Sequence, residues 1–242
     1  MHAKQHPHEA QRHNSKKAAG YGMSKPDLPA YTRGEERFNM ITHIVGGGLG
    51  LVAMLACVIV AAYNRNGWGV TSGIIYGFTV ILLFTMSSIY HGLKLELPKR
   101  VFRVLDHCTI YVLIAGTYTP IVLNRFRVVY PLDAWLIFGV IWGLAVLGIT
   151  LTAIDRKRFA VFSLVCYLGM GWIAIFRIHR LIEVLGGVFF MLILLGGVFY
   201  TVGVVFYAMG KRKKYMHSVF HLFVIAASIL HSVAIAAFVM VI

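Results

Sequence analysis

The residues of this chain that are best suited to chemistry are histidines and an aspartate, each near the end of an apolar stretch. His217 and His221 are four residues apart, so both lie on one face of a helix. Ser87 and His91 have the same spacing. A helical pair of histidines at this spacing is typical of a metal clamp, and His91 would complete a set of three imidazoles, the open pattern of a catalytic zinc site. Asp106 would then hold the activated water and Ser87 would orient it or a substrate carbonyl.

Composition indicates that the elements carrying these residues span a membrane. The chain has 242 residues, of which 59% are hydrophobic and only 13% are charged, whereas soluble domains average about 25% charged residues. The formal net charge is +14, but the basic residues lie in the N-terminal segment and in short loops, as they do when they fix membrane orientation. We therefore expect an all-α integral protein of the cell membrane, in bacteria the inner membrane, with lipids and not nucleic acid as its partners.

Seven apolar stretches follow the N-terminal segment. Most are about 20 residues or longer, which is the length that a helix needs to cross a bilayer. The predicted spans are 39–62, 70–93, 101–123, 132–152, 159–177, 183–208 and 215–240. The weakest break between them is at residues 177–180. The sequence therefore predicts a seven-transmembrane helix bundle, and nothing in it sets the oligomeric state.

The basic residues predict the orientation of this bundle. With the N-terminus inside, eighteen of the 23 Lys and Arg residues fall on the cytoplasmic side and five on the exterior side. Because basic residues are enriched in cytoplasmic loops, we expect a cytoplasmic N-terminus and an exterior C-terminus. His91, Asp106 and His217 then lie at the same cytoplasmic face.

The chain divides into two predicted domains. Residues 1–34 are polar, basic and rich in histidine, which favours a disordered cytoplasmic tail, and residues 35–242 form the membrane domain. Cys57, Cys108 and Cys166 lie inside apolar stretches and form no CxxC pair, so we expect neither a disulfide framework nor a cysteine zinc site.

Two interpretations of the polar cluster are open on spacing alone. Histidine near a membrane interface can be a hydrogen-bonded polar anchor, and a single histidine pair is weak support for a metal. Two helical pairs and an aspartate at one membrane depth favour a functional site, because ionisable residues near lipid are costly.

Four further polar residues belong to the candidate site. Glu36 and His43, two turns apart on one helix face, are expected to support its rim or to take part in proton transfer. His107 points away from the neighbouring aspartate, which favours a structural role. His231 lies fourteen residues beyond His217, about 21 Å deeper at 1.5 Å per residue. It either lines a substrate cavity or relays protons, or it is a hydrogen-bonded packing residue.

Five motifs lie at these helix ends: ERFNMITH (36–43), SSIYH (87–91), LDH (105–107), GTYTP (116–120) and HSVFH (217–221). Together they resemble the hemolysin III family, the bacterial branch of the progestin and adipoQ receptor superfamily. The combination is highly specific, although each motif alone is not, and the resemblance extends over residues 33–242. The long basic tail is absent from the family's pattern, so its function is open.

The resemblance implies seven helices around a zinc ion near the cytoplasmic face. It implies that His91, His217 and His221 bind the zinc and that Ser87 and Asp106 lie beside it. The superfamily is also similar to the alkaline ceramidases, which hydrolyse lipid amides at such a centre. We therefore expect a zinc-dependent hydrolase of lipid amide or ester bonds, linked to membrane lipid homeostasis.

Three other functions are open at the level of sequence. In a sensor or receptor-like membrane protein, zinc would only brace the bundle. A pore-forming cytolysin would suit the family's name, but a pore needs polar residues along the whole membrane depth. A proton- or ion-coupled transporter would use His231, but the inverted-repeat halves common in such folds are not visible.

Overall fold

The computed structural model describes residues 28–241, and these residues are almost entirely helical. The part of the chain from Tyr31 onward forms one compact unit. Most of the tail predicted for residues 1–34 lies outside the described residues.

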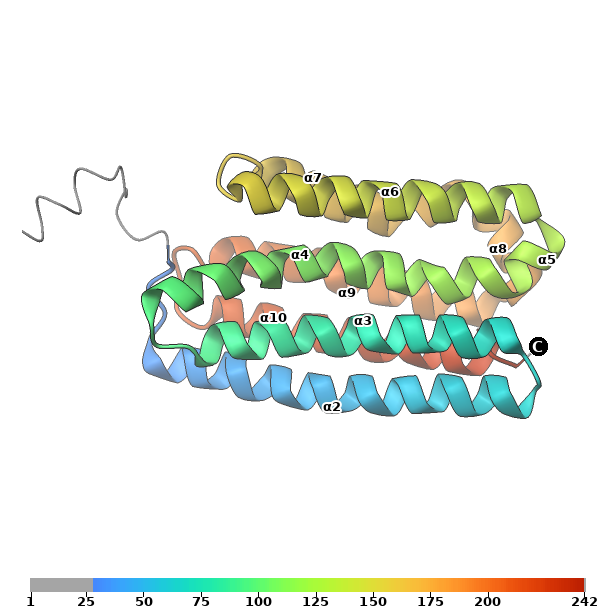
Figure 1. The fold of residues 1–242 in the computed structure, drawn as a ribbon, viewed down its shortest axis with the longest axis horizontal. Helices are drawn as coiled ribbons and strands as arrows, with labels where there is room; N and C mark the ends of the chain where they lie inside the picture. Colours follow the sequence, from blue (N-terminus) through green and yellow to red (C-terminus); the bar gives the residue numbers. More distant parts are fainter. Residues whose placement is uncertain (1–27, 242) are drawn as a thin grey trace, which may run out of the picture. The chain divides into compact units, whose positions relative to one another are not determined.

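Long helices run side by side in this unit, with α6 and α7 on one side of the bundle and α2 on the other (Figure 1). The last long helix, α10, contacts both α9 and the first helix, α2. The long helices are α2 (Arg33–Tyr63), α3 (Gly67–Gly92), α4 (Glu96–Ile121), α6 (Pro131–Asp155), α7 (Ala160–Trp172), α9 (Gly187–Met209) and α10 (Met216–Ala234). The shorter segments are η1 (Val122–Phe126), α5 (Arg127–Val129), η2 (Ile173–Arg177), α8 (Ile178–Leu185) and η3 (Ile235–Val239).

Six helical segments of the described chain are long and apolar enough to cross a membrane. They confirm the predicted all-α membrane protein. The helix α4 is not among the six, although it has 26 residues and contacts both α3 and α6. Its first half carries five charged residues, Glu96, Lys99, Arg100, Arg103 and Asp106, and its second half carries several threonines and tyrosines, so its mean hydropathy is low along the whole helix.

The predicted break at residues 177–180 is wrong. The helical segment continues from Ala160 to Leu185 and ends at Gly186, whose φ of 84° is in the region that favours glycine. The two arginines that suggested a loop are neutralised within the fold. Arg177 Nε lies 3.2 Å from Asp133 Oδ2, and the Arg180 guanidinium contacts the same oxygen.

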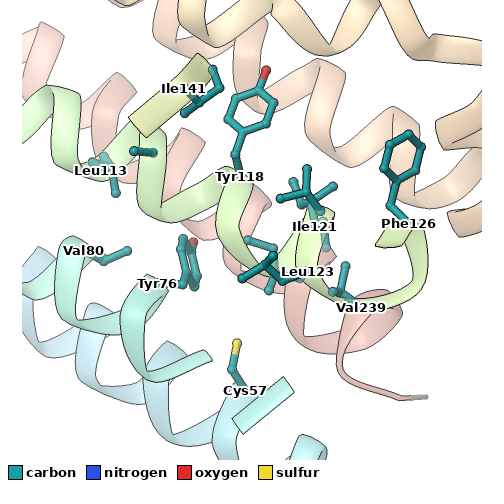
Figure 2. Packing of buried hydrophobic residues seen from close by; sticks show 14 of the residues in the cluster. Cys57, Tyr76, Val80, Leu113, Tyr118, Ile121, Leu123, Phe126, Ile141 and Val239 are labelled. Atoms are coloured by element: carbon teal, nitrogen blue, oxygen red, sulfur yellow. The ribbon is translucent and has the colours of Figure 1, made fainter. Parts of the chain in front are cut away.

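The core is built from apolar and aromatic side chains of several helices (Figure 2). Cys57 of α2 and Tyr76 of α3 are fully buried, as is Phe126 beyond the end of α4. The helices α3 and α4 approach closely at Gly116, where an added Cβ would lie 2.1 Å from Thr79 Oγ1. Close approach through small residues is how helices pack in a membrane, and here it draws α3 and α4 together.

The first and last long helices are tied together at the end of the bundle that carries the histidines. Thr32 caps α2 in a reciprocal capping box, in which Glu35 N–H donates to Thr32 and Glu35 Oε2 accepts the Thr32 backbone N–H. The other carboxylate oxygen, Oε1, accepts the N–H of Tyr215 at 2.6 Å. Tyr215 precedes α10 in a left-handed conformation with φ 60°. Glu35 therefore fixes both helix starts at once.

We predict that Glu35→Ala destabilises the protein, because it removes the cap of α2 and leaves the Tyr215 N–H without its acceptor. The expected loss is about 1–2 kcal/mol, measured as a lower thermal midpoint in detergent. Glu96→Ala is the matched control, since Glu96 is exposed and pairs with Arg100 within its own helix, a contact worth about 0.5 kcal/mol or less. Equal thermal midpoints for Glu35→Ala and Glu96→Ala would contradict the stabilising role of Glu35.

Candidate metal centre

Three buried histidines from two helices meet at one end of the bundle. His91 is close to the last residue of α3, while His217 and His221 lie in the first two turns of α10. The candidate ligand nitrogens of all three lie within 4.8 Å of one another. The Nε2 atoms of His217 and His221 are 3.0 Å apart. The spacing that placed the last two on one helix face therefore also points them at a common centre.

Glu36 determines which nitrogen of His91 is available. Its Oε2 lies 2.6 Å from Nδ1 of His91, and its Oε1 lies 2.8 Å from the Lys99 ammonium. A carboxylate ion only accepts hydrogen bonds, so the proton of the neutral imidazole sits on Nδ1 and the lone pair sits on Nε2. That Nε2 atom is buried and has no hydrogen-bond partner among the described residues. A carboxylate on the outer nitrogen of a ligating histidine is the usual support for a metal-bound imidazole.

The donor set fits a metal ion such as zinc. Zinc binds imidazole nitrogen at about 2.0–2.1 Å, so two nitrogens in a tetrahedral site are roughly 3.3 Å apart, close to the 3.0 Å between His217 and His221. The partnerless Nε2 of His91 is a buried polar atom that a cation would satisfy. Three imidazoles could therefore hold a metal ion, and imidazole suits zinc, copper, iron and nickel alike.

Ser87 and Asp106 lie on the cavity side of the three histidines. Ser87 is one turn before His91 on α3, and Asp106 is on α4. Both line the same cavity as His217 and His221. Neither belongs to the three-histidine group, so the structure places them beside the candidate metal position, where proton transfer or substrate contact is possible.

His43 and His107 surround the group in different ways. His43 stacks on His221, with ring centroids 3.7 Å apart, and both of its ring nitrogens are buried with no hydrogen-bond partner in the described part of the chain. His107 is satisfied within the protein, because its Nδ1 donates to the carbonyl of Arg103 at 2.8 Å and Tyr207 Oη lies 3.4 Å from its Nε2. His43 is thus packed against a candidate ligand, whereas His107 is held as part of the α4 framework.

A cavity of about 320 Å³ extends into the bundle from His217 and His221, two of the three histidines. This volume is within the range of small-molecule sites, about 300–1,000 Å³. Its polar end includes Asp106, Arg156 and Lys211, and much of its length is lined by apolar side chains, among them Ile110, Ile114, Ile121, Phe126, Leu181 and Phe189. His231 also lines it. The shape and lining suit an elongated apolar ligand with a polar end near the histidines.

Tyr31 covers the group and was not predicted. Its ring stacks on His217, with centroids 4.9 Å apart and an interplanar angle of 18°, and lies 5.8 Å from the ring of His91. Burial raises the pKa of the Tyr31 hydroxyl far above its usual range. The sequence placed this residue in the polar tail. The sequence feature that could have pointed to Tyr31 is its position, as an aromatic residue directly before the Thr32 capping box.

Comparison with known proteins agrees with this architecture. A profile of the family described as "Haemolysin-III related" matches residues 31–232. Hemolysin-3 of Bacillus cereus is 37% identical over 194 residues, covering 80% of this chain and 87% of the relative. A Hemolysin-3 homolog of Bacillus subtilis (strain 168) is 37% identical over 201 residues, covering 82% and 91%. The human monocyte to macrophage differentiation factor is 26% identical over 230 residues, covering 93% and 91%.

The match covers the elements that build the candidate site. It begins at Tyr31, the residue stacked on His217, and includes all three histidines of the group. The relatives and the apolar helices together identify a multi-pass protein of the bacterial cell membrane. The chain therefore belongs to the hemolysin III family, as its five motifs predicted.

Proposed function

We propose that this protein is a zinc-dependent hydrolase of lipid amide or ester bonds, acting in membrane lipid homeostasis. The observation that carries the proposal is a group of three convergent, buried imidazoles, two of which, His217 and His221, line the polar end of a largely apolar cavity. A lipid chain would occupy the apolar part, which leaves its carbonyl beside His91, His217 and His221.

The residues of the chain then have distinct roles. A zinc ion held by the three imidazoles would supply Lewis-acid polarisation of the carbonyl and a nucleophile at neutral pH. Asp106 accepts a proton at its carboxylate during attack and returns it to the leaving group, which is the general acid–base role. The Ser87 hydroxyl orients the carbonyl or the water. Glu36 keeps the proton of His91 on Nδ1, at 2.6 Å from its own Oε2.

We further propose seven spans with a cytoplasmic N-terminus, which puts the histidine group at the cytoplasmic face. The helix α4 is the additional span. Its 26 residues are enough to cross a bilayer, and it packs between α3 and α6. The ion pair of Lys99 with Glu36 lowers the cost of charge in its first turns.

Two non-enzymatic functions compete with the hydrolase. Zinc could brace the three-helix junction of a membrane sensor, an idea favoured by the stacking of Tyr31 and His43 on two candidate ligands. A pore-forming cytolysin is suggested by the name Hemolysin-3 of the Bacillus cereus relative. The apolar lining of the deep cavity is unlike the wall of a water-filled channel.

The metal site predicts the zinc content of detergent-purified protein. We expect about one zinc per chain, since three imidazoles and an open position make one site. His217→Ala and His221→Ala lose it, and Glu36→Gln keeps the site with roughly 10- to 100-fold weaker affinity. His179→Ala is the control, because His179 is an exposed histidine of α8. Wild-type protein without metal, or a full zinc content in His217→Ala, would sink the proposal.

Hydrolysis itself is tested with a panel of long-chain amides and esters in lipid vesicles. We expect Asp106→Asn to lower turnover by about 10²–10⁴-fold while zinc stays bound, because a general acid–base is lost, and Ser87→Ala to lower it less. Asp155→Asn, at an exposed carboxylate outside the cavity, leaves turnover unchanged. Zinc-loaded protein that cleaves nothing in the panel would favour the sensor, and conductance in planar bilayers would favour the pore.

If α4 is the seventh span, its two ends lie on opposite sides of the membrane. Single cysteines at Lys94 and Val128, both exposed, should react with a membrane-impermeant thiol reagent from the cytoplasm and from the exterior respectively. A cysteine at exposed Tyr63 reports the exterior side. Labelling of the Lys94 and Val128 positions from one side would show that α4 does not cross.

A further inference from the structure

His231 lines the same cavity as His217 and His221, further along α10. It lies ten residues after His221 on the helix that continues into η3, so it is about 15 Å further along the axis. Only 9% of its surface is exposed, and it lines the cavity. None of the roles assigned to the metal centre uses it.

The fold makes room for this imidazole and holds it in one orientation. Helix α9 passes His231 at Gly196, where an added Cβ would lie 2.4 Å from the imidazole Cδ2. The Nε2 atom is 3.1 Å from the carbonyl oxygen of Ile193, and Tyr200 packs edge-on against the ring at 5.5 Å between centroids. Gly196, Ile193 and Tyr200 all belong to α9, so the contact between α9 and α10 sets the position of the His231 ring.

The hydrogen bond to Ile193 determines what the other ring nitrogen can do. A carbonyl only accepts, so Nε2 carries a proton and Nδ1 of the neutral ring is an acceptor. No described residue donates to that Nδ1. The nearby Tyr200 hydroxyl is already hydrogen-bonded to Ser228 at 2.8 Å. That Nδ1 is not among the fully buried polar atoms that lack a partner, so it is open to the cavity that His231 lines, and the cavity is the place from which a donor can come.

We propose that His231 forms a polar subsite for a hydroxyl or amide N–H group carried on the apolar part of a long-chain lipid. The subsite deepens the proposed function and rests on it, because it assumes a lipid whose carbonyl or carboxylate end lies at the three histidines. His231 is then a specificity-determining residue. It selects chains with a hydrogen-bond donor in their distal half over chains that are wholly apolar.

The test is a binding series on detergent-purified, zinc-containing protein. The probes are octadecanoic acid and its isomers with one hydroxyl group at successive carbons, measured by displacement of a fluorescent fatty acid. Wild-type protein should bind an isomer hydroxylated in the distal half roughly two- to tenfold more tightly than octadecanoic acid, the effect of one neutral hydrogen bond. The methyl ether of that isomer has no donor and should show no gain.

Two aromatic variants locate the effect. His231→Phe should bind octadecanoic acid as the wild type does and lose the preference for the hydroxylated isomer. Tyr200→Phe is the control and should keep the preference, because its hydroxyl is bonded within the protein. The subsite is overturned if the wild type prefers no isomer, if the ether binds as well as the alcohol, or if His231→Phe keeps the preference. If His231→Phe does not fold, the binding of the hydroxylated isomers and of the methyl ether to the wild-type protein still tests the subsite.

The experiments distinguish an incorrect subsite proposal from an incorrect hydrolase proposal. The fatty acids contain no amide or ester bond, so their binding is read without any turnover. A preference that depends on His231 in a protein that cleaves no lipid would overturn the hydrolase and retain the subsite. Hydrolysis without any such preference would do the reverse.

Discussion

The hydrogen bond between Glu36 and His91 is the constraint on which the candidate centre depends. It spans 2.6 Å between residues that are 55 positions apart, and it sets the proton on Nδ1 so that Nε2 faces the other two histidines unprotonated. Without it, the ring could turn its proton inward and repel a cation. This bond joins α2 to α3, and the stacking of His43 on His221 joins α2 to α10 at the same end.

Local spacing predicted the features that repeat within one helix. The pair of His217 and His221, the long apolar runs and the polar cluster near helix ends all follow from periodicity and composition. Spacing and a common membrane depth also suggested the addition of His91 to that pair, and the resemblance implied the same three ligands. The structure brings the three within 4.8 Å, although the ligand roles themselves stay predictions. The break at 177–180 failed because charge was taken as a sign of a loop, whereas Asp133 pairs with both arginines.

Contacts between distant segments were beyond the reach of sequence. Glu36 was expected at the rim, but its partner His91 could not be chosen without the packing of α2 on α3. Tyr31 looked like part of a polar tail, and only the position of α10 reveals that its ring covers His217. The cavity, too, is a property of packed helices, so His231 remained ambiguous between packing and ligand contact. In the structure it bonds to Ile193 and lines the cavity.

The hydrogen bond from the Tyr215 N–H to Glu35 couples the start of α2 to the start of α10. The carboxylate that caps α2 is bonded to the backbone two residues before His217, and Tyr31 lies directly upstream of that cap. A displacement of Glu35 is therefore passed to the Tyr215 N–H and to the first turn of α10, where His217 lies. The start of α2 is in this sense mechanically coupled to the candidate metal site.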